Sequence, residues 1–190
     1  MRVFEIMSRK SAGVVVVRIE RMKDPTKIML SPDYIVGLTD GEGSFTAYIR
    51  PPKKEYGSKN YRVECHYYIK LRDDDRLLLE NVKKFFRIGR ISFQRENRPN
   101  HHHMYRFEVT NLNDLQKVII PFFEKYQLQS KRIKDFELFK KILRAVLKKD
   151  HHTIDGLKKI KQWKSKMHQY LGSLNTGKPY VQHRYGKSMF

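Results

Sequence analysis

Residues 31–50 read SPDYIVGLTDGEGSFTAYIR, and this stretch decides the fold of the chain. Ser31 can cap free helix amides, and the Pro-Asp pair behind it suits the positively polarised first turn of a helix. The apolar residues that follow predict a helix over residues 33–40, which Gly41 and Gly43 end. Beyond the glycines the hydrophobic period changes from that of a helix to that of a strand.

Apolar residues occupy the odd positions of residues 44–50 and of residues 61–71, as in two strands with one buried face. A second pair of strands shows the same alternation. The further elements that we expect are a helix over 73–86, strands over 90–94 and 104–110, and helices from Asn111 to a break at Pro121, from Ser130 to about 149 and from Thr153 to about 171. The pattern predicts an α+β fold in the order α-β-β-α-β-β-α, with helices on one face of an antiparallel sheet and two more basic helices at the C-terminal end.

The charge of the chain points to a polyanionic partner. Its 190 residues include 40 Lys and Arg against 20 Asp and Glu, a formal net charge of +20. Hydrophobic residues make up 39% and aromatic residues 12%, which is enough for the core of one domain and excludes a disordered basic tail. Nucleic acid is the first partner to expect, and an anionic membrane surface is the second.

Other features limit the class of protein further. The single cysteine, Cys65, excludes a disulfide framework and a cysteine-based zinc finger, and it falls on the buried parity of its strand. No segment has the length and apolarity of a membrane span, so we expect an intracellular protein without a membrane partner. Residues 1–30 are expected to form a loosely attached extension, residues 31–171 the domain, and residues 172–190 a poorly ordered tail. Residues 131–190 hold sixteen Lys and Arg against four Asp and Glu, a surplus suited to gripping phosphates.

The stretch Ile35–Gly43 resembles the motif that names the LAGLIDADG homing endonucleases. Four positions match letter for letter, namely Gly37, Leu38, Asp40 and Gly43. The stretches 85–91 and 126–131 also resemble the family, so that the resemblance covers about residues 31–172. It implies a saddle-shaped sheet and a site-specific endonuclease that makes a metal-dependent, staggered double-strand break in a long pseudo-palindromic DNA target. It further implies a gene carried in an intron or a similar mobile element, in bacterial cytoplasm or nucleoid or in an organelle.

Two acidic residues at the foot of the first helix are the predicted catalytic centre. Asp40 and Glu42 stand in a chain that otherwise favours positive charge, and carboxylates that face DNA phosphates need a divalent cation between them. Mg²⁺, for which Mn²⁺ can substitute, suits one or two carboxylates, and Gly41 lets the backbone approach closely. The predicted metal site is therefore residues 40–42, and a solvated helix end is the alternative. By resemblance, Lys131 is the basic residue near the scissile phosphate, whereas Leu71 stands where the family commonly ends its second strand with a polar residue.

The same helix and the predicted sheet supply the expected partner surfaces. Small residues four apart lie on one helix face, and the chain contains one motif, so the resemblance implies a homodimer in which each subunit supplies one Glu42. The interface residues are expected to be Tyr34, Gly37, Leu38 and Gly41, the alternative being that both glycines serve only turns and packing. The polar sheet face is expected to read base edges in the major groove of double-stranded DNA, with an ordinary solvated face as the alternative. The candidates on it are Tyr48, Arg50, Arg62, Glu64, His66, Tyr68, Lys70, Arg90, Gln94 and Arg106.

A protein that binds without cutting is the alternative function. It would be an RNA-splicing maturase acting on its own intron RNA, or a DNA-binding regulator on the same fold. The presence of both acidic residues favours the enzyme.

Overall fold

The computed structural model describes residues 30–52 and 60–169. All but the last residue of the extension predicted at 1–30, and the whole tail predicted at 172–190, lie outside the described residues. The described elements are α1 (Pro32–Glu42), β1 (Gly43–Arg50), β2 (Arg62–Arg72), η2 (Asp73–Asp75), α2 (Arg76–Phe86), β3 (Arg90–Gln94), β4 (Met104–Val109), α3 (Leu112–Asp114), η3 (Leu115–Ile119), α4 (Ile120–Lys125), α5 (Arg132–Leu147), η4 (Asp150–His152) and α6 (Ile154–Lys166). The predicted α+β order is confirmed.

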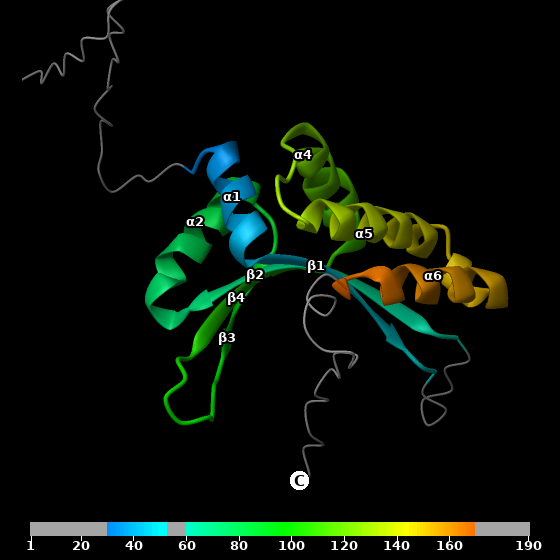
Figure 1. The fold of residues 1–190 in the computed structure, drawn as a ribbon, viewed down its shortest axis with the longest axis horizontal. Helices are drawn as coiled ribbons and strands as arrows, with labels where there is room; N and C mark the ends of the chain where they lie inside the picture. The colour runs from blue at the N-terminus through cyan, green and yellow to red at the C-terminus, as the bar shows by residue number, and fades with distance from the viewer. Residues whose placement is uncertain (1–29, 53–59, 170–190) are drawn as a thin grey trace, which may run out of the picture.

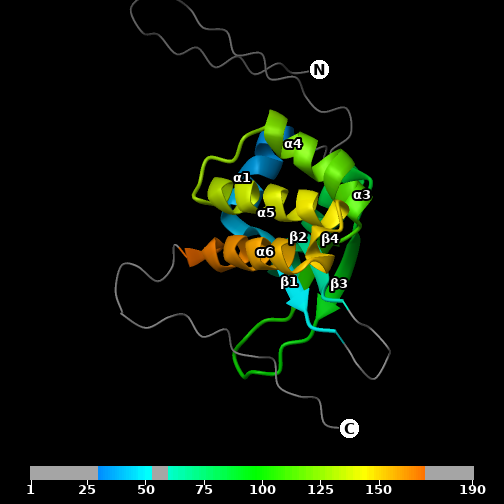
Figure 2. The same ribbon diagram turned by 90° about the vertical axis from the view of Figure 1, so that its right-hand side faces the viewer.

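The four strands form one antiparallel sheet in the order β1-β2-β4-β3. The sheet arches like a saddle, and helices α1, α2, α4 and α5 lie together on its convex side (Figure 1). Helix α6 packs against α5 and runs beside β1, the edge strand (Figure 2). No described helix runs across the concave face, which α6 borders at the β1 edge.

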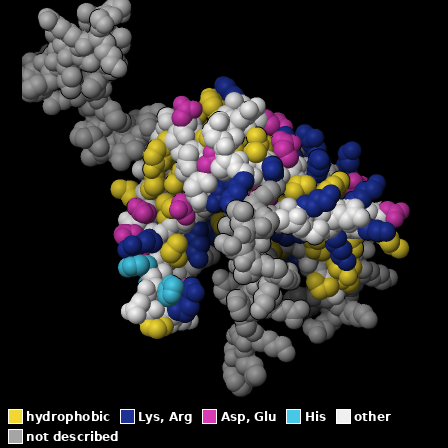
Figure 3. All heavy atoms as spheres, in the orientation of Figure 1, with side chains coloured by type: hydrophobic (Ala, Val, Ile, Leu, Met, Phe, Trp, Pro, Cys, Tyr) yellow, Lys and Arg dark blue, Asp and Glu magenta, His cyan; other side chains and the backbone are white. Residues whose placement is uncertain are grey.

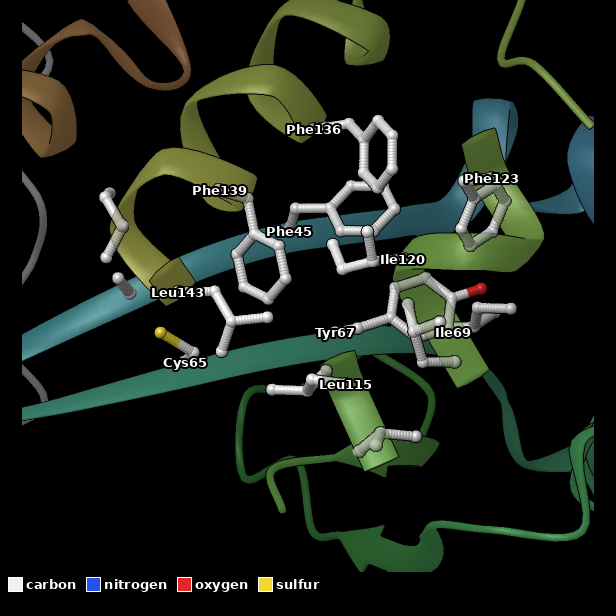
Figure 4. Packing of buried hydrophobic residues seen from close by; sticks show 14 of the residues in the cluster. Phe45, Cys65, Tyr67, Ile69, Leu115, Ile120, Phe123, Phe136, Phe139 and Leu143 are labelled. Atoms are coloured by element: carbon white, nitrogen blue, oxygen red, sulfur yellow. The ribbon is translucent and has the colours of Figure 1, made fainter. Parts of the chain in front are cut away.

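Aromatic side chains fill the space between the sheet and the helices (Figure 4). Phe45 of β1 stacks on Tyr67 of β2 with ring centres 5.0 Å apart, and Phe123, Phe136 and Phe139 surround Phe45 at 5.1 to 5.4 Å. These two strand residues and Cys65 have the odd parity that predicted burial, and all three are buried. The packing therefore confirms which face of the sheet is the core.

The junction between α1 and β1 has no linker. Gly43 is the cap of α1 and the first residue of β1, and a Cβ atom there would lie 2.6 Å from Cγ2 of Thr39. The Oγ1 atom of Thr39 is in turn 2.8 Å from the buried hydroxyl of Tyr67. The end of α1 is thus fixed directly onto the sheet.

Several predicted helix ends differ from the structure, and the last helix, expected to run to about residue 171, ends as α6 at Lys166. Helix α1 does not end at residue 40 but includes Gly41 and Glu42, because the backbone bonding continues until the Gly43 amide donates to the Thr39 carbonyl. Pro121 was predicted to interrupt or end its helix; it does not end it, since α4 continues to Lys125, but the geometry changes there from π-helical to α-helical. It stands at the start of α4, behind a π-helical turn, where a missing amide hydrogen costs no helix bond. In the described part of the chain, no helix has both the length and the apolar character needed to cross a bilayer.

Candidate nucleic-acid interface and acidic helix end

The two carboxylates predicted as a pair lie in different environments. The Glu42 side chain is exposed and makes no hydrogen bond or ion pair with any residue of 30–52 or 60–169. The carboxylate of Asp40 accepts three hydrogen bonds from the turn before α5, from the amide of Gln129 at 2.8 Å and from the amide and hydroxyl of Ser130 at 3.2 and 2.7 Å. Asp40 therefore joins α1 to α5, and Glu42 is the carboxylate left open to solvent.

Arg132 completes this connection from the other side. Its Nε donates to the carbonyl of Asp40 at 2.8 Å and its Nη2 to the carbonyl of Gly41 at 2.7 Å. Helix α1 has no basic residue in its last turn, so this guanidinium satisfies and neutralises the negative end of the helix. We call the contacts of Asp40 and Arg132 the α1–α5 clamp. Sequence reasoning missed Arg132, although it directly follows the predicted Lys131.

The other residues predicted around this centre lie as follows. Lys131 is exposed at the cap of α5, one residue before the clamp. Leu71 is buried in the core, so it does not hold the polar position that the resemblance suggested. Lys70 does face the polar side, and the register places it one step beyond the Gly43–Ile69 pair, next to the end of α1. Burial lowers the pKa of Lys70, and the positive charge of Arg106 lowers it further.

The concave sheet face gathers all ten predicted DNA-contact residues. Register partners share a face, and the rows across the sheet are Ser44–Tyr68–Glu108–Arg90 and Lys70–Arg106–Ser92. Tyr48, Arg50, Arg62, Glu64 and His66 continue this face along β1 and β2, and Gln94 ends it on β3. The geometry therefore confirms one continuous polar face, while its contact with DNA stays a prediction.

Carboxylates on this face hold several of its cations. Glu64 pairs with Arg50 at 3.3 Å and with Arg62 at 2.6 Å, all three side chains being partly or largely exposed. Glu108, which sequence reasoning did not select, is buried. Its carboxylate contacts His66, Arg90 and Arg106. Its signal was a carboxylate on the outward parity of its strand, two residues after Arg106.

Helix α6 adds positive charge at the β1 edge of this face. The ammonium group of Lys164 donates to the buried Thr46 hydroxyl at 2.9 Å, and burial lowers its pKa. Lys161 lies 4.8 Å from the ring centre of Tyr61. Figure 3 shows Lys and Arg side chains gathered over α5 and α6. Trp163, in contrast, packs against the core.

The outer face of α1 is open in this chain. Tyr34 is 47% exposed, and Gly37 and Gly41 are exposed as well. A Cβ atom built on either glycine meets nothing within 4 Å among the described residues. Leu38, half-buried, borders the same face. These are the residues predicted as the dimer interface, and they form a surface on which a second helix could lie closely.

Comparison with known proteins agrees with this geometry. The model of the LAGLIDADG endonuclease family matches residues 35–143. "Probable intron-encoded endonuclease 2" of Neurospora crassa is 37% identical over 133 residues, which are 69% of this chain and 28% of that protein. The structure of I-SmaMI bound to an uncleaved DNA target in the presence of calcium ions superposes with a TM-score of 0.65 at 33% identity, over 73% of this chain and 45% of that chain. The homing endonuclease I-TnaI superposes with a TM-score of 0.64 at 30% identity, over 75% of this chain and 91% of that chain.

The chain thus spans less than half the length of the N. crassa protein and of I-SmaMI, and nearly all of I-TnaI. The matched residues run from α1 through the sheet into α5 and contain both the acidic helix end and the concave polar face. On the family model and on this fold, the chain belongs to the LAGLIDADG endonuclease family.

Proposed function

We propose that this protein is a site-specific homing endonuclease that makes a metal-dependent, staggered double-strand break in a long pseudo-palindromic DNA target. The observation that carries the proposal is the exposed Glu42. The α1–α5 clamp holds the helix end that bears it, directly before the first strand of a polar, cation-rich sheet face. Family membership and the relative named as intron-encoded support a gene carried in an intron, and hence a protein that acts inside a cell or organelle. The concave face would lie in the major groove, which admits a two-stranded β ribbon and displays a distinct pattern for each base pair.

The metal chemistry is assigned to Glu42. No group of three or more metal-binding side chains exists among the described residues. An exposed carboxylate nevertheless fits Mg²⁺ or Mn²⁺, since these ions take one or two carboxylates and complete their shells with water and phosphate oxygens. When bound, the ion would polarise the scissile phosphate and lower the pKa of a bound water. The Asp40 carboxylate and the Gly41 carbonyl, predicted as further metal ligands, already accept hydrogen bonds from the turn before α5 and from Arg132. We therefore assign them to holding Glu42 in place. Lys131 is assigned to contacting the phosphate backbone.

A second copy of the motif would complete the site. The open face of α1 offers two exposed glycines four residues apart, and small residues at this spacing let two helix backbones approach closely. We assign this face to a homodimer, which would bring two Glu42 side chains together and match a two-fold target. Analytical ultracentrifugation tests the assignment. The wild type should sediment as a dimer and Gly37→Leu as a monomer, and a monomeric wild type that still cuts both strands would contradict it.

The cleavage test uses plasmids that carry the candidate intron-free insertion site. With Mg²⁺ the wild type should linearise its target, and Glu42→Gln should bind it equally but cut at least about 100-fold more slowly, because a metal ligand worth several kcal/mol is lost. Asp33→Asn removes an exposed carboxylate from the other end of α1 and serves as the matched control. Binding without any cut in Mg²⁺ or Mn²⁺ would refute the endonuclease activity and favour a maturase or a regulator. Binding to the intron RNA would then distinguish a maturase from a DNA-binding regulator.

A further inference from the structure

Glu108 is a buried acid on the face that we assign to DNA. Its side chain is 5% exposed, and the register places it between Tyr68 of β2 and Arg90 of β3. A carboxylate in this position would repel DNA phosphates and would lose its hydration unless cations surround it. Its presence at the centre of the concave face therefore needs an explanation beyond simple solvation.

Side chains from three strands meet this carboxylate, a histidine and two arginines. Oε1 is 2.8 Å from Nδ1 of His66 on β2 and 3.3 Å from Nη1 of Arg106 on β4. Oε2 accepts a hydrogen bond from Nη2 of Arg90 on β3 at 2.9 Å. Both oxygens are thus occupied, and the two arginines outweigh the single negative charge. Glu108 adds order to the face without making it acidic.

The two arginines differ in what remains free. Arg106 is 21% exposed, and its guanidinium carbon lies 3.9 Å from the ring centre of Tyr68, so it is enclosed. Arg90 is 70% exposed and touches Glu108 through one terminal nitrogen. A guanidinium carries five N–H donors, so most donors of Arg90 remain open to a partner on the concave side.

We infer that Glu108 is a positioning residue that holds Arg90 in place to read one base pair of each half-site. This inference rests on the proposed function, because it assumes that the concave face binds DNA. Arginine recognises guanine through two parallel hydrogen bonds in the major groove, and a guanidinium already held in place loses less conformational freedom on binding. Arg106 and His66 serve to neutralise and fix Glu108.

Glu64 supplies a matched control on the same face. It also pairs with two arginines, but its side chain is 25% exposed, and Arg50 and Arg62 are 57% and 74% exposed. Ion pairs open to water contribute little and fix geometry weakly. Glu64→Gln removes the same charge as Glu108→Gln without removing a buried anchor, so it reports the purely electrostatic effect.

The experiment is selection of bound sequences from a randomised double-stranded DNA library with the full chain. The wild type should prefer one base at the position that Arg90 reads. Glu108→Gln and Arg90→Lys should each weaken that preference about tenfold, at that position alone, and Glu64→Gln should leave it intact. Urea denaturation checks that the variants fold. Arg90→Lys changes a side chain that is 70% exposed, so this variant should keep the stability of the wild type. If Glu108 had only a structural role, Glu108→Gln would lower the urea midpoint without changing the base preference.

An unchanged profile in Glu108→Gln or Arg90→Lys overturns the inference and leaves the proposed endonuclease intact. The same loss in Glu64→Gln also overturns it, because charge alone would then explain the effect. A wild type that retains no DNA overturns both the inference and the proposed function.

Discussion

Replacing Asp40 by alanine should disconnect the end of α1 from the start of α5. The substitution removes the acceptor of the Gln129 amide and of both donors of Ser130, residues that lie 89 and 90 positions further along the chain. The Arg132 half of the clamp bonds main-chain carbonyls and therefore survives. The expected result is a folded but less stable protein in which the Glu42 end of α1 is more loosely held.

The size of the loss follows from these bonds. Hydrogen bonds to a charged group contribute about 1.5–3 kcal/mol each when water is excluded. Gln129 is exposed, so water can replace its bond, whereas Ser130 is half-buried and its amide is left less well satisfied. We therefore expect a loss of about 3 kcal/mol in the free energy of unfolding, which corresponds to a fall in Tm of roughly 10 °C for a chain of this size.

Equilibrium urea denaturation of the full chain measures this loss. Asp33→Ala, at the exposed first turn of the same helix, should cost only about 0.3–1 kcal/mol through the helix dipole. Ser130→Ala and the double variant with Asp40→Ala complete a cycle whose coupling energy should be about 1 kcal/mol. The clamp is refuted if Asp40→Ala costs no more than Asp33→Ala, or if the two clamp substitutions are simply additive.

Three further outcomes are expected. Gly43→Ala should lower the free energy of unfolding by about 1–3 kcal/mol in urea titrations, because the new Cβ would overlap the preceding turn at 2.6 to 2.8 Å, whereas Gly37→Ala meets no atom and should not destabilise the monomer. For Asp135, burial acts to raise the carboxyl pKa, but the hydrogen bonds of His168 hold that pKa below its ordinary value, so the stabilisation is present at neutral pH and is lost as the pH falls through the lowered folded-state pKa. Urea midpoints of wild type and Asp135→Asn should therefore differ at neutral pH and converge only as the pH falls below the lowered folded-state pKa of Asp135. The third outcome concerns the slope of log DNA affinity against log salt concentration. Replacing exposed lysines of α6 by glutamine (Lys158, Lys161 and Lys166) should reduce this slope by about 0.9 for each phosphate that the variant no longer neutralises. The same replacement at Lys83 and Lys84 of α2, on the helix-covered side of the sheet, should leave the slope unchanged.

The sheet and its polar face were predictable because their signals are local. The alternation of apolar and polar residues along 44–50 and 61–71 indicates which side chains face the core. Antiparallel pairing of the neighbouring strands then follows. The same parity correctly predicts that Tyr48, His66 and Lys70 lie on one face. Period two needs no knowledge of distant residues, and it is therefore readable from a single sequence.

The clamp was not predictable for the converse reason. Asp40 meets its donors across 89 and 90 residues, and no local pattern states which turn will lie against the end of α1. The continuation of α1 through Gly41 has the same origin. Glycine costs a helix about 1 kcal/mol, and the bonds that Arg132 gives to the last carbonyls offset this cost. Local propensity predicted the earlier end, and a tertiary contact moved it.

The junction at Gly43 links these findings to function. Glu42 is the last residue of α1 and Gly43 the first residue of β1, so no linker separates the exposed helix face from the sheet. In the proposed homodimer, contact between the two α1 helices would fix the distance between the two Glu42 carboxylates. The same contact would fix the two concave faces relative to each other, since β1 continues directly from α1. The spacing of the two cuts and the spacing of the two half-sites would then be set by one rigid unit, so that a single substitution at Gly43 should disturb both together.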